Sequence, residues 1–205
     1  MLPFPDGALD RLERAARGEC VAVGLHIPGV LTGTWNIGAV EDQFAAEPWV
    51  LIEWAKRTRG LILNPAVNKP MRNIEDVVKL KFQARQPEAG SDLVLTDLLR
   101  QAGMVRTDLN LVPSVERSES DLALAIASGR ADVGLGIEAS ARQFQLKFVP
   151  LVRERFDLRV WRKTYFDPPF QKLVRFCSTP GFAERARILG GYDVEGFATV
   201  HFNAA

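Results

Sequence analysis

Two segments of this chain carry nearly the same pattern, and this repeat constrains the fold more than any other feature. Residues 8–27 read ALDRLERAARGECVAVGLHI, and residues 121–137 read DLALAIASGRADVGLGI. Each segment combines an amphipathic helical run, a turn marked by Gly18 or Gly129, and a short apolar strand with the pattern Val-Gly-Leu-x-Ile. Two similar helix–strand segments predict two similar lobes, with a cleft between them that would bind a small ligand.

Helical and strand patterns alternate along the rest of the chain at the spacing of βα units. The sequence therefore predicts an α/β fold with mainly parallel sheets and flanking helices. We expect one lobe to contain residues 1–78 and 156–205, and the other to contain residues 79–155. Strands are predicted at 20–27, 49–54, 59–63, 81–84, 110–115, 133–137, 147–151 and 156–161.

Composition narrows the class of protein. The 205 residues are 47% hydrophobic and 25% charged, which is typical of a globular domain with a sizeable core. The 26 basic and 25 acidic residues leave a net charge of +1, which argues against a nucleic-acid surface. Cys20 and Cys177 lie far apart in apolar context, so we interpret them as buried side chains rather than a disulfide or zinc ligands. The absence of a signal-like N-terminus or a long apolar run favours the cytoplasm and no membrane contact.

No sequence motif indicates catalysis. The chain lacks G-x-S-x-G, Walker, H-E-x-x-H and G-x-G-x-x-G patterns, so we expect a binding protein rather than an enzyme, without a cofactor or a metal. Ligands of α/β sheets bind where strands end and helices begin, because unpaired N–H groups there attract anions. This rule selects His26, Thr34 and Asn36 after the first strand, and Arg85, Gln86, Gly90 and Ser91, then Ser118, Glu119 and Ser120, and finally Glu138.

Each of these candidates also has a purely structural explanation. A structural histidine would account for His26, and turn chemistry for Asn36. Gly90 and Ser91 fit the start of a helix, and Ser118 with Asp121 has capping-box spacing. Glu138 opens a predicted helix, where its charge favours the helix dipole without any ligand.

An ordered set of short segments resembles a known family. The set resembles the periplasmic-binding-protein-like domain, of the type II, molybdate-binding-like kind, that occurs in bacterial helix-turn-helix regulators and some molybdopterin-biosynthesis proteins. This resemblance implies a two-lobed fold that senses a small ligand, such as molybdate or another oxyanion, without catalysis. It extends over roughly residues 15–200. The segments that carry it are 24–26, 33–36, 60–62, 85–86, 129–132, 134–139, 148–151, 154–158 and 190–193.

The chain departs from the family pattern at the expected anion site. Glu88, Asp92 and Glu119 stand where the pattern has Gly, Arg and His. Two unit charges about 4 Å apart interact by roughly 4 kcal/mol at an effective dielectric of 20, so these carboxylates would repel molybdate unless they point away. An organic or cationic ligand, or lost binding, then competes with an oxyanion. The first lobe also starts abruptly, which suggests that it is incomplete. Such a lobe would fit a truncated regulator whose DNA-binding domain is missing, a degenerate stand-alone domain, or a protomer that borrows an element from a partner, of which we favour truncation or degeneracy.

Three functions remain open. The first is a ligand-sensing domain linked to transcriptional regulation or molybdenum metabolism, which would bind a small molecule or oxyanion, contact no nucleic acid itself and form a homodimer. The second is a small-molecule enzyme that would use His26 and Glu138 as an acid–base pair. The third is a degenerate domain that serves oligomerisation, which exposed Trp35, Trp49 and Trp161 would favour.

Overall fold

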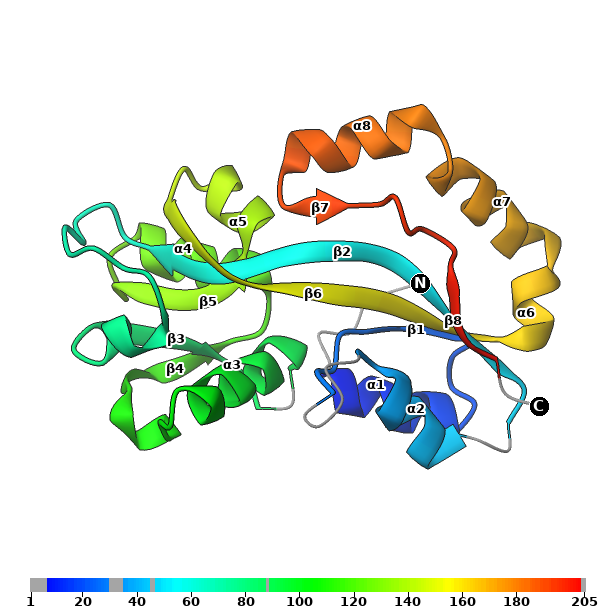
Figure 1. The fold of residues 1–205 in the computed structure, drawn as a ribbon, viewed down its shortest axis with the longest axis horizontal. Coiled ribbons are helices and arrows are strands. Elements are labelled where there is room, and N and C mark those ends of the chain that lie inside the picture. Colours follow the sequence, from blue (N-terminus) through cyan, green and yellow to red (C-terminus); the bar gives the residue numbers. More distant parts are fainter. Residues whose placement is uncertain (1–6, 30–34, 45–46, 88, 204–205) are drawn as a thin grey trace. The chain divides into compact units, whose positions relative to one another are not determined.

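The computed structural model describes residues 7–29, 35–44, 47–87 and 89–203. The chain divides into two compact units (Figure 1). The central unit is built on Thr58–Arg153, and the terminal unit on Ala8–Arg57 and Glu154–Ala205. The strands β2 (Trp49–Leu63) and β6 (Lys147–Trp161) are each 15 residues long and contribute to both units.

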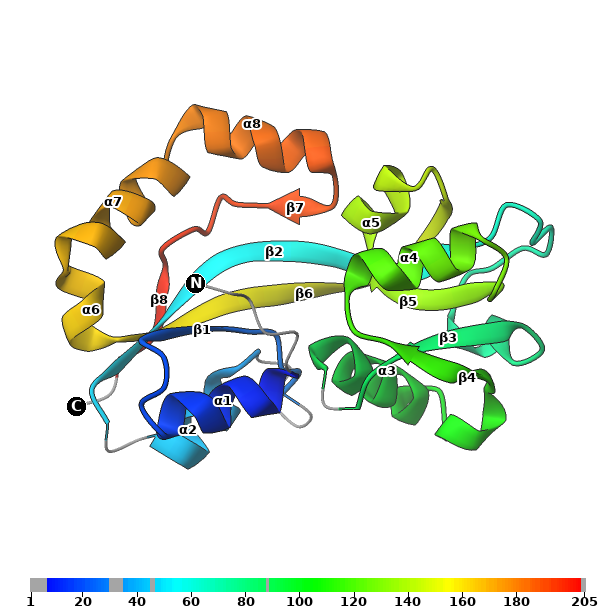
Figure 2. The same cartoon turned by 180° about the vertical axis from the view of Figure 1, so that it is seen from behind.

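The terminal unit has helices on both faces of its strands (Figures 1 and 2). Side chains alternate between the faces of a strand, so Val23, Leu25 and Leu51 pack with α1 and α2, whereas Val50, Ile52 and Val160 pack with α7. The strand β1 pairs with β6, and both β7 and β8 pair with β2. Besides parts of β2 and β6, the elements of the terminal unit are α1 (Ala8–Ala16), β1 (Ala22–Leu25), α2 (Ile37–Phe44), α6 (Arg162–Phe166), α7 (Pro168–Cys177), α8 (Pro180–Leu189), β7 (Tyr192–Asp193) and β8 (Val200–Asn203).

The central unit carries the second copy of the sequence repeat, α4 with β5. The strand β5 pairs with β3 on one side and with the C-terminal end of β2 on the other, and β3 also pairs with β4. Helices α4 and α5 cover a core that includes Ile62, Leu122 and Ile126. Its elements are η1 (Ile74–Val77), β3 (Lys81–Arg85), α3 (Gly90–Gln101), η2 (Arg106–Asp108), β4 (Asn110–Glu116), α4 (Glu119–Ala127), β5 (Val133–Ile137) and α5 (Glu138–Gln143).

The structure confirms the α/β class and the repeated helix–strand segment. One copy, α1 with β1, lies in the terminal unit, and the other, α4 with β5, lies in the central unit. The units divide at residues 57/58 and 153/154, rather than at the predicted lobe boundaries of 78/79 and 155/156. The first boundary differs because residues 59–63 pair with β5 and therefore group with the central unit.

The expectation of mainly parallel sheets applies only to part of the structure. The pairs β3–β4 and β3–β5 are parallel, whereas β1–β6, β2–β5, β2–β7 and β2–β8 are antiparallel. Parallel pairs need a crossover connection of a dozen residues or more, and the helix α3 and the helix α4 supply such connections around β3, β4 and β5.

Two pairs of predicted strands are single long strands. The strands predicted at 49–54 and 59–63 form one strand, β2, and those predicted at 147–151 and 156–161 form β6. The residues between them, 55–58 and 152–155, are polar but include neither Gly nor Pro, so nothing in them breaks an extended backbone. Residues 74–77 form a short 3₁₀ turn, η1.

Candidate functional site

The strand ends of the central unit bring together three charged side chains from distant parts of the sequence. Arg59 lies on β2 opposite Ile137, the last residue of β5. Arg85 is the last residue of β3, and Glu119 is the first residue of α4. Because the parallel strands β3 and β5 end at the same edge of the sheet, these residues converge there.

Glu119 forms ion pairs with both arginines. Its Oε1 accepts hydrogen bonds from Nη1 and Nη2 of Arg59, both at 3.0 Å, and lies 3.1 Å from Nη1 of Arg85. Arg85 also donates to the backbone carbonyls of Glu116 and Arg117, at 3.0 and 2.8 Å. Arg59 is fully buried. Two guanidinium groups and one carboxylate leave this cluster, which we call the arginine cluster, with a net charge of +1.

The helix α3, which follows Arg85, begins without a side-chain cap among the described residues, although the N–H of Asp92 donates to the carbonyl of Ala89 at 2.8 Å. Ser91, in the first turn, is 2% exposed, and its Oγ has no hydrogen-bond partner among the residues that the structure describes. A buried hydroxyl without a partner is unusual, because its desolvation costs about 1–3 kcal/mol. The N-terminus of α3 thus offers donors to an anion.

The acidic residues of this region do not act as free negative charges. Asp92, in the same turn as Ser91, pairs with Arg106, whose Nη1 lies 2.6 Å from Oδ1 of Asp92. Glu119 is neutralised by the two arginines described above. Repulsion of an oxyanion by Asp92 and Glu119 stays a prediction, and the ion pairs with arginines reduce the negative charge that these two residues would present. Glu88 lies outside the described residues.

Two glycines of the repeat allow other groups to pack closely against β5. A Cβ on Gly136 would lie 3.2 Å from Oε2 of Glu119 and 2.6 Å from Cδ1 of Ile62. A Cβ on Gly134 would lie 2.9 Å from the carbonyl oxygen of Gln83. The alternation of glycine along β5 thus allows neighbouring groups to approach the strand closely.

The other predicted residues of the central unit have structural roles or lie nearby. Ser118 is the N-cap of α4, where its Oγ accepts from the N–H of Asp121 at 3.0 Å. Glu138 pairs with Arg142 one turn further along α5. Ser120 is exposed. Gln86 follows Arg85 directly, and its backbone N–H donates to Glu116, while Gly90 is the first residue of α3.

In the terminal unit, Asn36 organises the loop that follows β1. Its Oδ1 accepts from the N–H of Ile27 at 2.6 Å, and its Nδ2 donates to Oδ2 of Asp157 at 2.8 Å. Asn36 is 2% exposed and has a positive φ of 64°, a conformation that asparagine tolerates well. These contacts match the turn-chemistry explanation. Thr34, the third predicted residue of this loop, lies outside the described residues.

His26 belongs to a second charged cluster that is confined to the terminal unit. Its Nδ1 lies 3.3 Å from Oε2 of Glu154, and its ring packs beside Phe156 with centroids 5.9 Å apart. Arg57 forms an ion pair with the other oxygen of Glu154 and lies over the ring of Phe156 at 4.4 Å. Glu154 is fully buried. The suggested acid–base pair of His26 and Glu138 stays a prediction, and each residue has a charged partner within its own unit.

Sequence reasoning missed the buried charges of the long strands. Arg57 and Glu154 lie between predicted strands and Arg59 begins one, yet none of the three was proposed as a site residue. The available signal was the charge itself, since Asp, Glu and Arg are rarely fully buried unless they are paired. Glu53 follows the same rule, because it is 3% exposed and lies 2.9 Å from His201.

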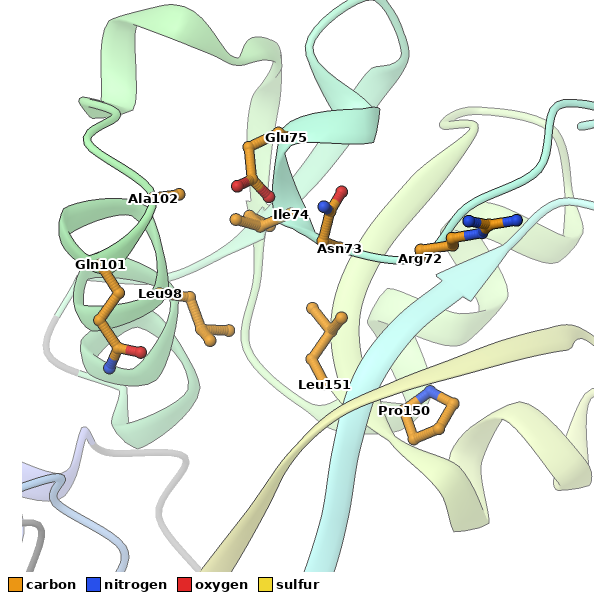
Figure 3. A pocket seen from close by; sticks show the side chains of 9 residues that line it. All are labelled: Arg72, Asn73, Ile74, Glu75, Leu98, Gln101, Ala102, Pro150 and Leu151. Carbon is orange, nitrogen blue, oxygen red and sulfur yellow. The ribbon is translucent and has the colours of Figure 1, made fainter.

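A separate cavity of about 290 Å³ lies at the other end of α3 (Figure 3). Ile74, Leu98 and Leu151 converge in it, and polar side chains such as Glu75 and Gln101 surround them (Figure 3). Gln101 is ten residues from Ser91, or about 15 Å along the helix. This cavity is therefore distinct from the arginine cluster.

Of the three tryptophans whose exposure would favour the oligomerisation alternative, Trp49 is buried. It is 1% exposed and contacts the edge of Trp161 with ring centroids 5.0 Å apart. Trp35 and Trp161 are partly buried. Trp49 belongs to a core cluster with Val40 and Phe44 of α2, where a large aromatic ring contributes much buried area.

These features define a class of protein: two α/β units built around shared long strands, as in type II periplasmic-binding-protein-like folds. A family model described as the PBP superfamily domain matches residues 2–178, and the chain belongs to this family.

Sequence and structure comparisons agree with this assignment. The chain is 26% identical over 191 residues to YvgK of Bacillus subtilis (strain 168), a match that covers 92% of this chain and 61% of YvgK. It is similar in fold to the CcmR regulatory domain of Synechocystis PCC6803 in complex with 2-PG, with a TM-score of 0.60, 11% identity, and coverage of 83% and 77% of the two chains. PhnD1 of Prochlorococcus marinus (MIT 9301), in complex with methylphosphonate, gives a TM-score of 0.56, 14% identity, and coverage of 83% and 68%.

Two features are absent from the part of the chain that the structure describes. None of its helices combines the length and apolar character that a bilayer crossing needs. The same residues include no group of three or more His, Cys, Asp or Glu side chains that could hold a metal ion.

Proposed function

We propose that this chain is a ligand-binding, sensing module whose central unit holds a small oxyanion at the arginine cluster and the N-terminus of α3. The observation that carries the proposal is the combination of a net positive cluster with a buried, unpartnered hydroxyl. Arg59, Arg85 and Ser91 would each contribute to the ligand, since the guanidinium groups supply charge and Ser91 supplies a directed hydrogen bond.

The chemistry of the site favours an anion over a cation. A cation would meet two guanidinium groups, and Glu119 is already occupied by both of them. An anion gains both the excess charge and the unpaired donors of the helix, which stabilise negative charge at such positions. The ligands in the PhnD1 and CcmR complexes, methylphosphonate and 2-PG, are also consistent with a preference for small anions in this fold.

Molybdate is the first candidate among the oxyanions, and it rests on the family resemblance of the sequence. Sulfate, phosphate and small phosphonates have the same tetrahedral group and test the alternatives. The chain spans 61% of the length of YvgK, so a role in transcriptional regulation or molybdenum metabolism is proposed for the whole protein rather than for this domain alone.

The decisive experiment is a calorimetric titration with molybdate, tungstate, sulfate, phosphate and methylphosphonate. Binding of at least one of them, with a matching rise in melting temperature, is expected. The substitution Ser91→Ala should weaken that binding by roughly 10-fold or more, since a hydrogen bond to a charged group contributes about 1.5–3 kcal/mol.

The serine substitution has a matched control in the same unit. Ser128→Ala removes a hydroxyl that donates to Ala125 at the other end of α4, and it should leave anion affinity unchanged. Because the Ser91 hydroxyl has no partner, Ser91→Ala should not lower stability. If no oxyanion binds, or if both serine variants bind equally well, the proposed site is wrong.

A further inference from the structure

The C-terminal half of α3 borders a mainly apolar cavity of about 430 Å³, which we call the turn cavity. Thr96, Leu99 and Arg100 contribute to its wall, and their spacing of three and four residues places them on one face of the helix. Leu98 and Gln101, which line the cavity of Figure 3, lie on the other side of the helix. The turn cavity is therefore separate from that cavity.

A left-handed glycine at the end of α3 completes the turn cavity. Gly103 has a φ of 67°, a conformation that glycine adopts without strain. Its N–H donates to the carbonyl of Arg100 at 3.1 Å, and the N–H of Met104 donates to that of Leu99 at 2.8 Å. This pair of hydrogen bonds is a Schellman motif, which brings the residue after the glycine close to the last turn of the helix. Residues 104–106 thereby supply the rest of the wall.

The apolar part of the wall has room for an aliphatic chain. Leu99 is buried, Met104 is half-buried, and Val105 is 61% exposed, so the cavity is accessible from solvent. A volume of about 430 Å³ lies within the range of small-molecule pockets, roughly 300–1,000 Å³. Methionine is flexible and polarizable, and it adapts to ligands of varied shape. The described residues of the wall include no aromatic ring, which favours an aliphatic body over a flat one.

The charged part of the wall consists of two guanidinium groups, and no acidic side chain is among its described residues. Nη2 of Arg100 lies 2.7 Å from Oδ1 of Asp97, and Nη1 of Arg106 lies 2.6 Å from Oδ1 of Asp92. The two arginine side chains are 55% and 37% exposed, so a ligand can reach them. A guanidinium carries five N–H donors, and one ion pair leaves others for a second acceptor.

We propose that the turn cavity is a second ligand site, separate from the arginine cluster, and that it binds a small aliphatic carboxylate. The hydrocarbon chain would pack against Leu99, Met104 and Val105, and the carboxylate would accept charge-assisted hydrogen bonds from Arg100 and Arg106. An aliphatic ammonium would place a like charge beside the two guanidinium groups, and a neutral chain would gain the apolar contacts alone.

Methionine-methyl NMR with hexanoate as the probe tests this site directly. Of the three methionines of the chain, Met104 lines the turn cavity, whereas Met71 is 9% exposed in the same unit and serves as the internal reference. Hexanoate should shift the methyl resonance of Met104 in a saturable manner and leave that of Met71 in place. Acetate has the charge without the chain, hexanol has the chain without the charge, and hexylammonium has the opposite charge. Each of the three should bind several-fold more weakly than hexanoate.

The role of the guanidinium groups is tested by Arg100→Gln, because the exposed pair of Arg100 with Asp97 contributes little to stability. The substitution should weaken hexanoate binding by roughly 10-fold, since a hydrogen bond to a charged group contributes about 1.5–3 kcal/mol. Arg142→Gln is the matched control and should leave binding unchanged. Arg142 is 58% exposed and pairs with a carboxylate of its own helix, but it lies outside the turn cavity.

Two further variants locate the ligand. Val105→Glu adds a negative charge at an exposed position of the wall and should abolish binding, whereas Val78→Glu, at another exposed valine of the same unit, should not. Leu99 is eight residues beyond Ser91, or about 12 Å along the helix, so Ser91→Ala should leave the response to hexanoate unchanged.

Four results would overturn the proposal. The first is a Met104 resonance that hexanoate does not move, and the second is hexanol that binds as tightly as hexanoate. The third is equal affinity of Arg100→Gln and Arg142→Gln. The fourth is loss of the response in Ser91→Ala, which would place the carboxylate at the arginine cluster instead.

Discussion

Arg59 and Arg159 are both fully buried, yet their surroundings stabilise them in different ways. Arg59 is paired with a carboxylate, whereas Arg159 is stacked between Phe44 and Trp49. A planar guanidinium can stack on aromatic faces, and a compact ammonium group cannot do so equally well. Substitution by lysine, which preserves the charge, should therefore change the free energy of unfolding differently at Arg59 and at Arg159.

We expect Arg159→Lys to destabilise the protein although the charge is kept. Loss of the stacked geometry should lower the free energy of unfolding by about 1–3 kcal/mol, measured by urea denaturation. The exposed Arg175→Lys, in α7 of the same unit, is the control and should change it by less than about 0.5 kcal/mol. Equal effects of the two substitutions would contradict a specific role for the stacking.

Glu119→Gln should affect stability and ligand binding in opposite directions. The glutamine keeps an acceptor oxygen but removes the negative charge that pairs with Arg59 and Arg85, so we expect the free energy of unfolding to fall by about 3 kcal/mol. The net charge of the arginine cluster would rise from +1 to +2, and oxyanion affinity should increase. The control is Glu138→Gln, which removes an exposed ion pair with Arg142 and should alter neither quantity appreciably. A stable variant with unchanged affinity would argue against the cluster as the anion site.

At the scale of elements, the long strands depend on a single glycine. A Cβ added to Gly60 of β2 would overlap the carbonyl oxygen of Val149 in β6 and lie 2.8 Å from its carbonyl carbon. Backbone atoms cannot move aside as the end of a flexible side chain can. The close approach of β2 and β6 within the central unit therefore requires glycine here.

Gly60→Ala is accordingly expected to be strongly destabilising, by at least about 2 kcal/mol in chemical denaturation. Gly38, in α2, provides the opposite case, because a Cβ there would meet no atom within 4 Å. Gly38→Ala should stabilise by roughly 0.5–1 kcal/mol, since alanine costs less conformational entropy in a helix. A neutral Gly60→Ala would show that the two strands are not held this close in solution.

At the scale of the whole molecule, one buried carboxylate links folding to pH. Burial raises the pKa of Asp157, and hydrogen bonds from Arg155 and Asn36 only partly oppose this rise. The folded protein therefore binds more protons than the unfolded chain between the two pKa values. The contribution of Asp157 to stability is thus largest at low pH and is lost as the pH rises from about 4 through its folded pKa.

Asp157→Asn should remove this part of the pH dependence. The melting temperature is measured from pH 4 upward in steps of roughly one pH unit. It should decline less for the variant than for the unmodified chain. Asp167→Asn, an exposed carboxyl at the start of α7, is the control and should retain the full decline. A steeper decline in Asp157→Asn would mean that pairing with Arg155 outweighs burial.

Local structure and the division into similar parts follow from neighbouring residues in the sequence. The helix–strand repeat, the alternating faces of β1 and the caps at Ser118 and Thr179 all depend on residues close together in the chain. Short-range periodicity and capping chemistry report such features directly, which is why the α/β class and the repeat were predictable.

Only the tertiary structure decided which distant groups meet. Arg59 and Glu119 are 60 residues apart, and Glu47 and Arg159 are 112 residues apart, so no local pattern identifies them as partners. The same holds for the antiparallel pairs that the long strands form with other elements. The strand β6 pairs with β1 near the start of the chain, and β2 pairs with β8 near its end. Sequence periodicity shows which side of an element is buried, but the identity of what covers that side is set by long-range packing.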